Sequence, residues 1–310
     1  MLQQYEDLKP YVVAVVVTHY PDLALLGRQL ISLVPQVTAV VIVDNGSSDD
    51  LVAWNAQGGF SVTDVIALGE NRGIATAHNM GIRWARQRQA TFVLLMDQDS
   101  IPAADMVKQL LAIAATYPSL AAAGPRYWDE RQAVGSNKLT AFIRLEGLRL
   151  KRCSCDTADA VIPVSYLVSS GCLIPMAVLD KVGDMRDEFF IDYVDFEWGL
   201  RAAQQGLQSY GVCAAHLQHR LGDSHIRFFK KNIPLHRPVR HYYLLRNAVI
   251  LYKEPSVSLR WKIADGVRLL LKCIFYVMFA KQRLTHGRMI LLGGWHGLLG
   301  KMGKFNQEPF

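Results

Sequence analysis

The feature that most constrains the fold is a repeated order along the first hundred residues. A short run rich in apolar residues is followed by a polar loop and then by a segment with helical spacing. Four such runs occur, at Val12 to Val17, Val37 to Val43, Val62 to Ala67 and Phe92 to Met96. Such runs are typical of strands buried on both faces of a parallel sheet. Their alternation with helices predicts a doubly wound, mostly parallel α/β sheet of the Rossmann-like kind.

Polar side chains follow each of the four runs. They are Thr18 and Tyr20, then Asp44, then Asn71 and Arg72, and finally Asp97 and Asp99. Because the carboxyl ends of parallel strands meet at one edge of a sheet, these side chains are expected to converge on one cleft that binds a nucleotide. The chain contains no G-x-x-x-x-G-K-[ST] motif and no G-x-G-x-x-G after the first run. These absences argue against a P-loop protein and against a typical dinucleotide-binding fold.

Asp97 and Asp99 stand one residue apart, directly after the apolar run Phe92 to Met96. Two carboxylates so placed can lie on one side of an extended turn. Hard oxygen ligands of this kind, completed by water and phosphate, are what Mg²⁺ or Mn²⁺ takes when it binds a diphosphate. A solvated Asp-rich turn is the structural alternative, and the polar loops beside it favour the metal site.

A second acidic region lies between Asp187 and Glu197, where five acids are interleaved with aromatic residues. We expect a helix from Asp195 to about Gln205. Acidic residues in a first turn stabilise the helix dipole, which is a sufficient structural explanation. Aromatic residues packed around carboxylates also raise their pKa toward the range of a general base or acid, so a catalytic role is the competing hypothesis.

The segments between these regions give weaker signals. Ile101 to Tyr117 is predicted to be a helix with Pro102 at its start. Ala121 to Lys151 is predicted to form irregular loops and short strands, and Val161 to Ile174 two strands around a Ser-Ser-Gly turn.

The positive charge of the chain is concentrated in its last third. The net charge is +7, but residues 1–219 carry 17 Lys and Arg against 23 Asp and Glu, whereas residues 220–310 carry 17 against 4. Such asymmetry indicates an anionic partner, either nucleic acid or a membrane surface. Leu259 to Ala280 reads as a basic amphipathic helix whose longest uncharged run, Cys273 to Ala280, is too short to span a bilayer. It fits a helix in the membrane interface or a plain core helix.

Length and cysteine content bound the remaining possibilities. We expect a catalytic domain over residues 1–250 and a helical extension over 251–310. The five cysteines include no C-x-x-C pair, which argues against a zinc ribbon or a disulfide framework and fits a reducing cytoplasm. The N-terminus carries Glu6 and Asp7 and leads into the first strand, so it is not read as a signal peptide.

Six segments carry a resemblance to a known family. They are VVVTHYP, VIVDNGSSD, LGENRGIATAHNMGI, LLMDQDS, FFIDYVDFEWGLRA and the tail HRLGD…HYYLLRN. Over about residues 11–250 the chain resembles the inverting family 2 glycosyltransferases with the GT-A fold. Within them it looks most like bacterial dTDP-rhamnosyltransferases of O-antigen and cell-surface polysaccharide synthesis. The resemblance implies a GT-A type sheet with a basic, membrane-proximal C-terminal extension.

Chemistry and resemblance together give roles for the donor site. Asp44 would accept a hydrogen bond from the N3–H of thymine or uracil. Thr18 and Tyr20 would line the base, and Arg72 would close over it with Asn71 beside it.

The same reasoning gives roles at the reacting end. Asp97 would lie near the ribose and the metal, Asp99 would ligate Mg²⁺ or Mn²⁺, and the resemblance makes His219 a further metal or phosphate contact. Many relatives place the general base in a Glu-Asp pair, but this chain has valine before Asp195. We choose Asp195 as the base, and Asp192 or Glu197 could share its work.

These roles imply a transferase that moves a sugar from a nucleotide-sugar donor, with dTDP-rhamnose favoured, to a lipid-linked saccharide acceptor. Such an enzyme would be cytoplasmic and peripheral on the inner face of the cell membrane, docked on anionic lipid.

A UDP-hexose-using transferase of the same fold is the nearest alternative. A nucleotidyltransferase would need a Gly-rich basic loop after the first strand, and the segment THYPDLALLG is neither Gly-rich nor basic. A non-catalytic nucleotide- or membrane-binding protein would not account for Asp97, Asp99 and Asp195. The charge of the tail also fits nucleic acid, but no recognised nucleic-acid motif is present.

Overall fold

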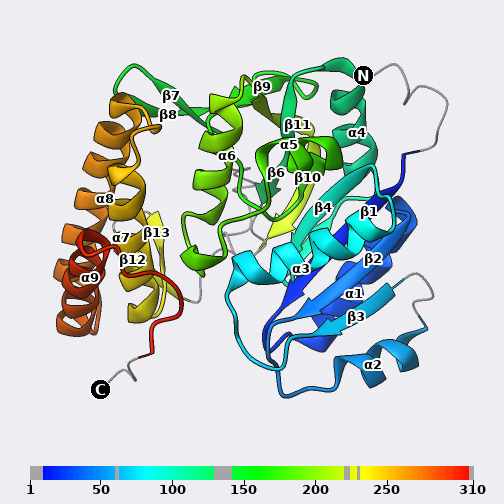
Figure 1. Ribbon diagram of the computed structural model, residues 1–310, viewed down its shortest axis with the longest axis horizontal. Helices are drawn as coiled ribbons and strands as arrows, with labels where there is room; N and C mark the ends of the chain where they lie inside the picture. The colour runs from blue at the N-terminus through cyan, green and yellow to red at the C-terminus, as the bar shows by residue number, and fades with distance from the viewer. Residues whose placement is uncertain (1–9, 60–62, 129–141, 220–223, 229–230, 307–310) are drawn as a thin grey trace.

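A nine-stranded sheet forms the centre of the molecule (Figure 1). The computed structural model describes residues 10–59, 63–128, 142–219, 224–228 and 231–306. The sheet has the order β3-β2-β1-β4-β10-β6-β11-β5, with β9 paired to β11. The N-terminal residues 1–9 and the residues Arg220 to Asp223 of the HRLGD motif, on which parts of the sequence analysis rest, lie outside the described residues.

One half of the sheet is parallel. β1 (Val12–Thr18) lies between β2 (Ala39–Asp44) and β4 (Phe92–Asp97), and β3 (Thr63–Ala67) pairs with β2. All seven residues of β1 are buried. Alternate residues of β1 belong to two different hydrophobic clusters, one on each face of the sheet. Burial on both faces explains why these strands are apolar without alternation, and it confirms the expected doubly wound half.

Helices cover both faces of the sheet. One face is covered by α1 (Leu23–Leu33), α2 (Leu51–Gly58) and α4 (Met106–Thr116). The other is covered by α3 (Ile74–Gln87), α5 (Met176–Val182) and α6 (Val194–Gln204). The helix α3 lies so close to the sheet that a Cβ added at Gly81 would be 2.1 Å from a methyl group of Val15.

The other half of the sheet is mixed. β10 (Cys172–Pro175) runs antiparallel to both β4 and β6 (Leu120–Trp128), and β6 pairs in parallel with β11 (Gln208–His219). β11 is also antiparallel to β9 (Val161–Val164) and to β5 (Ser100–Pro102). The sheet therefore has four parallel and four antiparallel pairs of strands.

Two expectations for this half need correction. The helix predicted from Ile101 begins only at Met106, because residues 100–102 pair with the end of β11 instead. The segment from Ala121, expected to be irregular with short strands, begins with most of the nine-residue strand β6. Both strands owe their conformation to partners distant in the chain, and local spacing does not reveal such partners.

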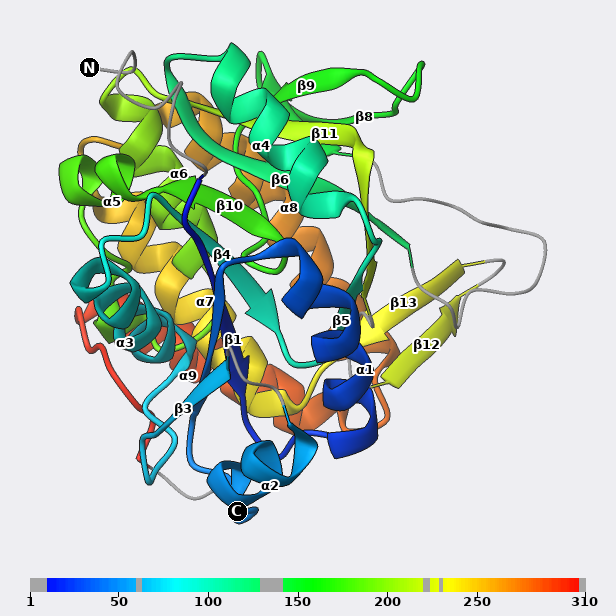
Figure 2. The same ribbon diagram turned by 90° about the vertical axis from the view of Figure 1, so that its right-hand side faces the viewer.

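The remaining elements are short. They are η2 (Val34–Gln36), β7 (Phe142–Glu146), β8 (Arg149–Cys153), η3 (Asp187–Phe189), β12 (Ser224–Phe228) and β13 (Lys231–Leu235). β7 and β8 form one hairpin, and β12 and β13 form another that stands apart from the main sheet (Figure 2).

Three helices follow the sheet: α7 (Pro238–Lys253), α8 (Leu259–Phe279) and α9 (Arg283–Leu298). They lie side by side at one end of the molecule (Figure 1). A Cβ at Gly293 of α9 would lie 2.3 Å from a backbone oxygen of α7, so these two helices pack backbone to backbone. Residue 250, the expected limit of the catalytic domain, lies inside α7, and the division into two units stays a prediction.

The helix α8 shares features of both structures expected for it. Trp261, Leu269 and Tyr276 are buried, as in a core helix. Leu270 and Leu271, by contrast, are 60% and 63% exposed. Across the described ranges, no helix combines the length and apolarity needed to cross a bilayer.

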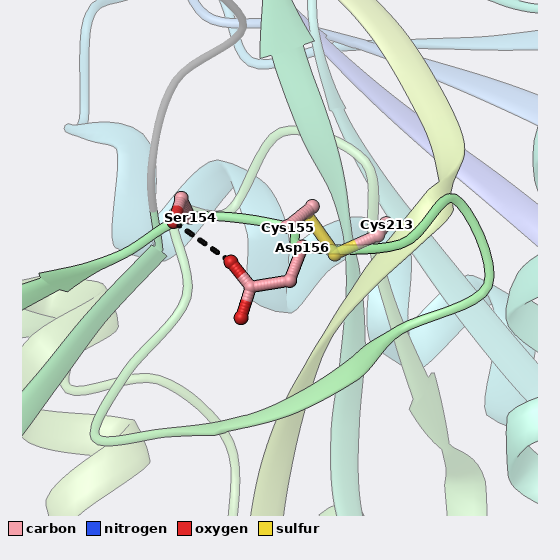
Figure 3. Close-up of a disulfide and its surroundings, with 4 residues drawn as sticks. All are labelled: Ser154, Cys155, Asp156 and Cys213. Atoms are coloured by element: carbon pink, nitrogen blue, oxygen red, sulfur yellow. Dashed lines mark hydrogen bonds between the residues drawn. A yellow bond between two sulfur atoms is a disulfide. The ribbon is translucent and has the colours of Figure 1, made fainter.

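A disulfide joins Cys155 to Cys213 (Figure 3), so the expectation against disulfides was wrong. Cys155 follows β8, and Cys213 lies within β11, 58 residues later in the chain. The backbone N–H of Cys213 donates to the carbonyl of Ala160 over 3.0 Å, which brings the two segments together. The pair arises from tertiary contact without any local motif, and the cysteines no longer support a reducing compartment.

Candidate active site

The first part of the candidate site is the buried carboxylate of Asp44, at the end of β2. The hydroxyls of Thr18 and Ser47 both donate to its Oδ1, the former over 2.9 Å, and the backbone N–H of Ser47 donates to Oδ2 over 2.9 Å. The parallel register places Thr18 directly opposite Asp44. Since a carboxylate offers about four acceptor positions, Oδ2 keeps one for a ligand. Sequence reasoning found Thr18 and Asp44 but missed Ser47.

Two loops close against each other beside this carboxylate. The side chain of Asn45 accepts from the backbone N–H of Arg72 over 2.8 Å and donates to Asn71 over 3.2 Å. Gly46, at a φ of +86°, lies against the backbone of Asn71 so closely that a Cβ there would be 2.6 Å from its nitrogen. Only glycine fits this position. The structure therefore joins Asn71 and Arg72 to Asp44, as expected, through a residue, Asn45, that the sequence analysis had not selected.

Tyr20 and Arg72 are exposed residues in the loops that follow β1 and β3. Tyr20 has a φ of +49°, is 59% exposed, and donates its backbone N–H to Ser47 over 2.8 Å. The Arg72 side chain is half exposed and lies 3.5 Å from Glu70. A ring and a guanidinium with this exposure are free to pack on a base that enters above Asp44.

Asp97, Asp99 and His219 form one cluster at the end of β4. Ligand atoms of all three lie within 4.8 Å of one another. Nε2 of His219 is 4.0 Å from Asp97, and its Nδ1 is 3.5 Å from Asp99. The two carboxylates are partly exposed, whereas the imidazole is buried. Two carboxylate oxygens and a nitrogen suit Mn²⁺ or Mg²⁺, so this donor set fits the expected divalent metal.

His219 is the last residue of β11, and the pairing of this strand places it beside Asp97 and Asp99. In the antiparallel register of β5 and β11, His219 stands directly opposite Ser100, the residue after Asp99. The residues of β11 show no clear strand pattern, so the sequence predicts no strand there. The histidines from His219 onward are candidate metal ligands by their position in the chain, and the family resemblance selects His219 among them. The tertiary pairing places it beside the carboxylates.

Asp195, at the start of α6, lies beside this cluster. Its Oδ2 accepts the backbone N–H of Ser169 over 3.1 Å. Burial raises the pKa of Asp195 to about 7, and the nearby negative charge of Asp97 adds to the increase. A carboxylate with this pKa is half deprotonated near neutral pH and can accept a proton from a hydroxyl.

Asp192 occupies a different environment three residues earlier. Burial acts to raise its pKa, but the positive charge of Arg240 and its hydrogen bonds outweigh burial, and the pKa of Asp192 is lowered. Arg240 donates to both carboxylate oxygens, over 2.9 and 3.3 Å. An acid held ionised by a guanidinium is a weak base, so the environment of Asp192 suits a structural ion pair.

Glu197 is not brought together with the other candidates. It is buried and binds Arg201, one turn later in α6, through two hydrogen bonds of 2.9 and 3.0 Å. Two residues apart on a helix, Asp195 and Glu197 point to different sides, about 200° apart.

The loop that carries Asp192 has a strained backbone, and hydrogen bonds from α7 hold it in place. Phe190, Asp192 and Tyr193 all have positive φ angles, between 61° and 65°. The buried amide of Asn247 in α7 donates to three carbonyls of this loop, including that of Asp192 over 2.8 Å. Left-handed backbone at three non-glycine residues costs free energy and persists only where the surroundings enforce it. Sequence reasoning missed Asn247, although it closes the HYYLLRN segment of the resemblance.

Comparison with known proteins identifies the family of this chain. The model of the family described as "Glycosyl transferase family 2" matches residues 14–168. The chain is 31% identical to the dTDP-rhamnosyl transferase RfbF of Shigella flexneri over 290 residues, which is 94% of this chain and 96% of the relative. The chain belongs to glycosyl transferase family 2. The family and the enzyme class expected from the sequence are thereby confirmed.

More distant relatives agree on the fold. A hexosyltransferase of low-salt glycan biosynthesis, Agl10 of Haloferax volcanii, is 23% identical over 89% of this chain and 88% of its own. Among solved structures, GalNAc-T7 with UDP, GalNAc and Mn²⁺ matches with a TM-score of 0.61 at 11% identity, over 95% of this chain and 56% of that longer one. S. aureus TarS 1-349 with UDP-GlcNAc matches with a TM-score of 0.59 at 14% identity, over 94% and 81%. The expected GT-A fold class is confirmed.

Proposed function

We propose that this glycosyltransferase is metal-dependent and inverting, and that it moves L-rhamnose from dTDP-rhamnose to a hydroxyl of a lipid-linked saccharide in cell-surface polysaccharide synthesis. The observation that carries the reaction type is the position of Asp195, a partly buried carboxylate with a pKa of about 7 that lies near Asp97 of the Asp97, Asp99 and His219 cluster. The similarity to the rhamnosyl transferase over nearly the whole chain supports the donor sugar.

The nucleotide would bind over Asp44. The remaining acceptor position on its Oδ2 fits the N3–H of thymine or uracil, with Tyr20 and Arg72 packing on the ring. The hydroxyl of Thr18, committed to Asp44, fixes the orientation of that carboxylate. Asn71 acts indirectly here, because its amide holds the loop that carries Arg72.

Asp97, Asp99 and His219 would hold Mg²⁺ or Mn²⁺, whose charge stabilises the diphosphate as it leaves. The neighbouring carboxylate of Asp195 would take the proton of the acceptor hydroxyl while that oxygen attacks the anomeric carbon. One displacement by an external hydroxyl inverts the anomeric centre and needs no enzyme nucleophile. Asp192 and Glu197, both held by arginines, would support the site without accepting the proton.

The C-terminal helices would bring the site to a lipid-linked acceptor. Large apolar residues of α8 and α9 stay exposed in stripes with helical spacing; Leu270, Ile274 and Val277 form one, and Leu284, Leu291, Trp295 and Leu298 form the other. Nine Lys and Arg lie in residues 259–304, and the sole acid in that stretch, Asp265, is buried. Basic charge around exposed apolar residues matches an anionic bilayer. We therefore propose that the enzyme docks on the cytoplasmic face of the cell membrane, where the Cys155–Cys213 pair would be kept reduced.

A donor screen tests the proposed function. Purified protein with Mn²⁺ or Mg²⁺ is incubated with dTDP-rhamnose, UDP-hexoses or GDP-sugars, and release of nucleoside diphosphate is measured with and without EDTA. We expect hydrolysis that depends on metal and is fastest with dTDP-rhamnose. Preference for a UDP-hexose would move the assignment to the alternative transferase, and activity unaffected by EDTA would contradict the metal site.

A further inference from the structure

Two buried serines lie against the cluster of Asp97, Asp99 and His219. Ser100 and Ser170 are fully buried. The Oγ of Ser100 lies 2.6 Å from Nδ1 of His219 and 2.7 Å from the Oγ of Ser170. Ser170 also accepts the backbone N–H of Asp97 over 3.2 Å. The two hydroxyls thus connect two of the three proposed metal ligands from inside the protein.

The fold fixes both serines by their backbones. Ser100 is the first residue of β5 and pairs with His219 across the antiparallel register. Ser170 precedes Gly171, which has a φ of +75° and donates its N–H to the carbonyl of Leu95 over 2.7 Å. A Cβ at Gly171 would lie 2.5 Å from Pro125, so only glycine lets this turn sit against the sheet.

The direction of these hydrogen bonds depends on which nitrogen of His219 carries the proton. If Nε2 faces the metal with a lone pair, Nδ1 must hold the proton and donate it to Ser100. The hydroxyl of Ser100 then donates to Ser170. In the reverse arrangement Ser100 donates to Nδ1, and the ring proton sits on Nε2, the nitrogen that faces Asp97. A neutral imidazole binds a metal only through its unprotonated nitrogen, so only the first arrangement is competent.

We propose that Ser100 and Ser170 are positioning residues for the metal. Ser100 accepts the Nδ1–H of His219 and so keeps Nε2 available as a ligand, and Ser170 orients Ser100 by accepting its hydroxyl proton in a hydrogen bond. This inference rests on the proposed metal dependence. Histidine ligands generally donate their second ring N–H to a fixed acceptor, and loss of that acceptor typically weakens metal affinity by about 10- to 100-fold. Here the acceptor is the hydroxyl of Ser100, which in turn donates a hydrogen bond to the buried hydroxyl of Ser170.

The test compares Mn²⁺ affinity with nucleotide affinity. Mn²⁺ is titrated into protein saturated with dTDP, and dTDP is titrated separately in EDTA, by calorimetry. For Ser100→Ala we expect Mn²⁺ binding to weaken by about 10- to 100-fold, with dTDP binding in EDTA within about twofold of the wild type. Ser32→Ala is the matched control, because Ser32 donates to the carbonyl of Pro102 in the same strand, β5, without contacting His219. It should leave both affinities unchanged.

A second variant and a double variant separate positioning from general damage. Ser170→Ala should weaken Mn²⁺ binding in the same direction. If both serines act on one histidine through one path, the double variant should lose less than the product of the two single losses. Should Ser100→Ala fail to fold, Ser170→Ala still decides the matter.

Three outcomes would overturn the proposal. One is folded Ser100→Ala and Ser170→Ala proteins that bind Mn²⁺ within twofold of the wild type. Another is an equal loss of Mn²⁺ and metal-free dTDP affinity, which would indicate structural damage. Absence of Mn²⁺ binding in the wild-type protein would remove the metal site itself, and that result is distinct from a failure of the serines alone.

Discussion

Replacement of Asp195 by asparagine tests the proposed base most directly. Asparagine is nearly isosteric, and its amide oxygen can still accept the N–H of Ser169, but it cannot take a proton. Transfer to the acceptor should fall by roughly 10²- to 10⁴-fold, because that is the usual contribution of general base catalysis. Binding of dTDP with Mn²⁺ should survive, since Asp195 belongs to neither the nucleotide site nor the metal cluster.

The same substitution should stabilise the metal-free protein at high pH. The pKa of Asp195 is raised from its ordinary value of 3.8 to about 7 in the folded protein. The folded state therefore holds this proton more tightly than the unfolded state, and stability is lost as the pH rises from about 4 through 7. Relative to Asp195→Asn, the wild type should lose about 2–3 kcal/mol between pH 5 and pH 8. The variant should then be less active and more stable.

Urea unfolding in EDTA at pH 5 and pH 8, for wild type and variant, measures this difference. Asp192→Asn is the matched control, because the pKa of Asp192 is lowered by Arg240 and the substitution should destabilise the protein at both pH values. The reasoning is refuted if Asp195→Asn shows no relative gain at pH 8. If Asp195→Asn also keeps near-native turnover while Asp192→Asn loses it, the base is Asp192.

Four further outcomes are expected. Asp99→Ala should abolish metal-stimulated donor hydrolysis and leave the melting temperature unchanged, since the side chain is only partly buried. Full metal stimulation in the variant would show that Asp99 is not a metal ligand. Asn247→Ala should lower the free energy of unfolding by roughly 2–4 kcal/mol, because three carbonyls lose their donor, and a change below 1 kcal/mol in urea unfolding would contradict that account. The double variant Leu270→Glu, Leu291→Glu should sediment less with anionic vesicles, whereas Ile31→Glu, at a similarly exposed position, should sediment like the wild type. High salt should release part of the wild-type protein from the vesicles. Equal sedimentation of the two variants would contradict a membrane-binding surface on α8 and α9. Cys155→Ser should lower the urea midpoint only under oxidising conditions, and an equal loss in reducing buffer would show that packing, and not the disulfide, is responsible.

The sequence by itself determined the parallel half of the sheet and the nucleotide end of the site. β1, β2 and β4 are buried on both faces, so their apolar runs are continuous and their ends are easy to recognise. Parallel strands bring their carboxyl ends together, so Thr18, Asp44 and Asp97 could be placed at one edge from chain order alone.

Tertiary structure alone decided the mixed half of the sheet and the environment of each acid. β6, β11 and β5 form because they pair with one another across long stretches of chain, and this pairing puts Ser100 opposite His219. A separate contact of β11 with the segment that ends at Ala160 puts Cys213 beside Cys155. The roles of Asp192 and Asp195 look interchangeable in the sequence. Arg240, from a helix some 50 residues later, holds the first ionised, while burial beside Asp97 raises the pKa of the second. A pKa is set by the charges and solvent around a group after folding, and neighbours distant in the chain supply both.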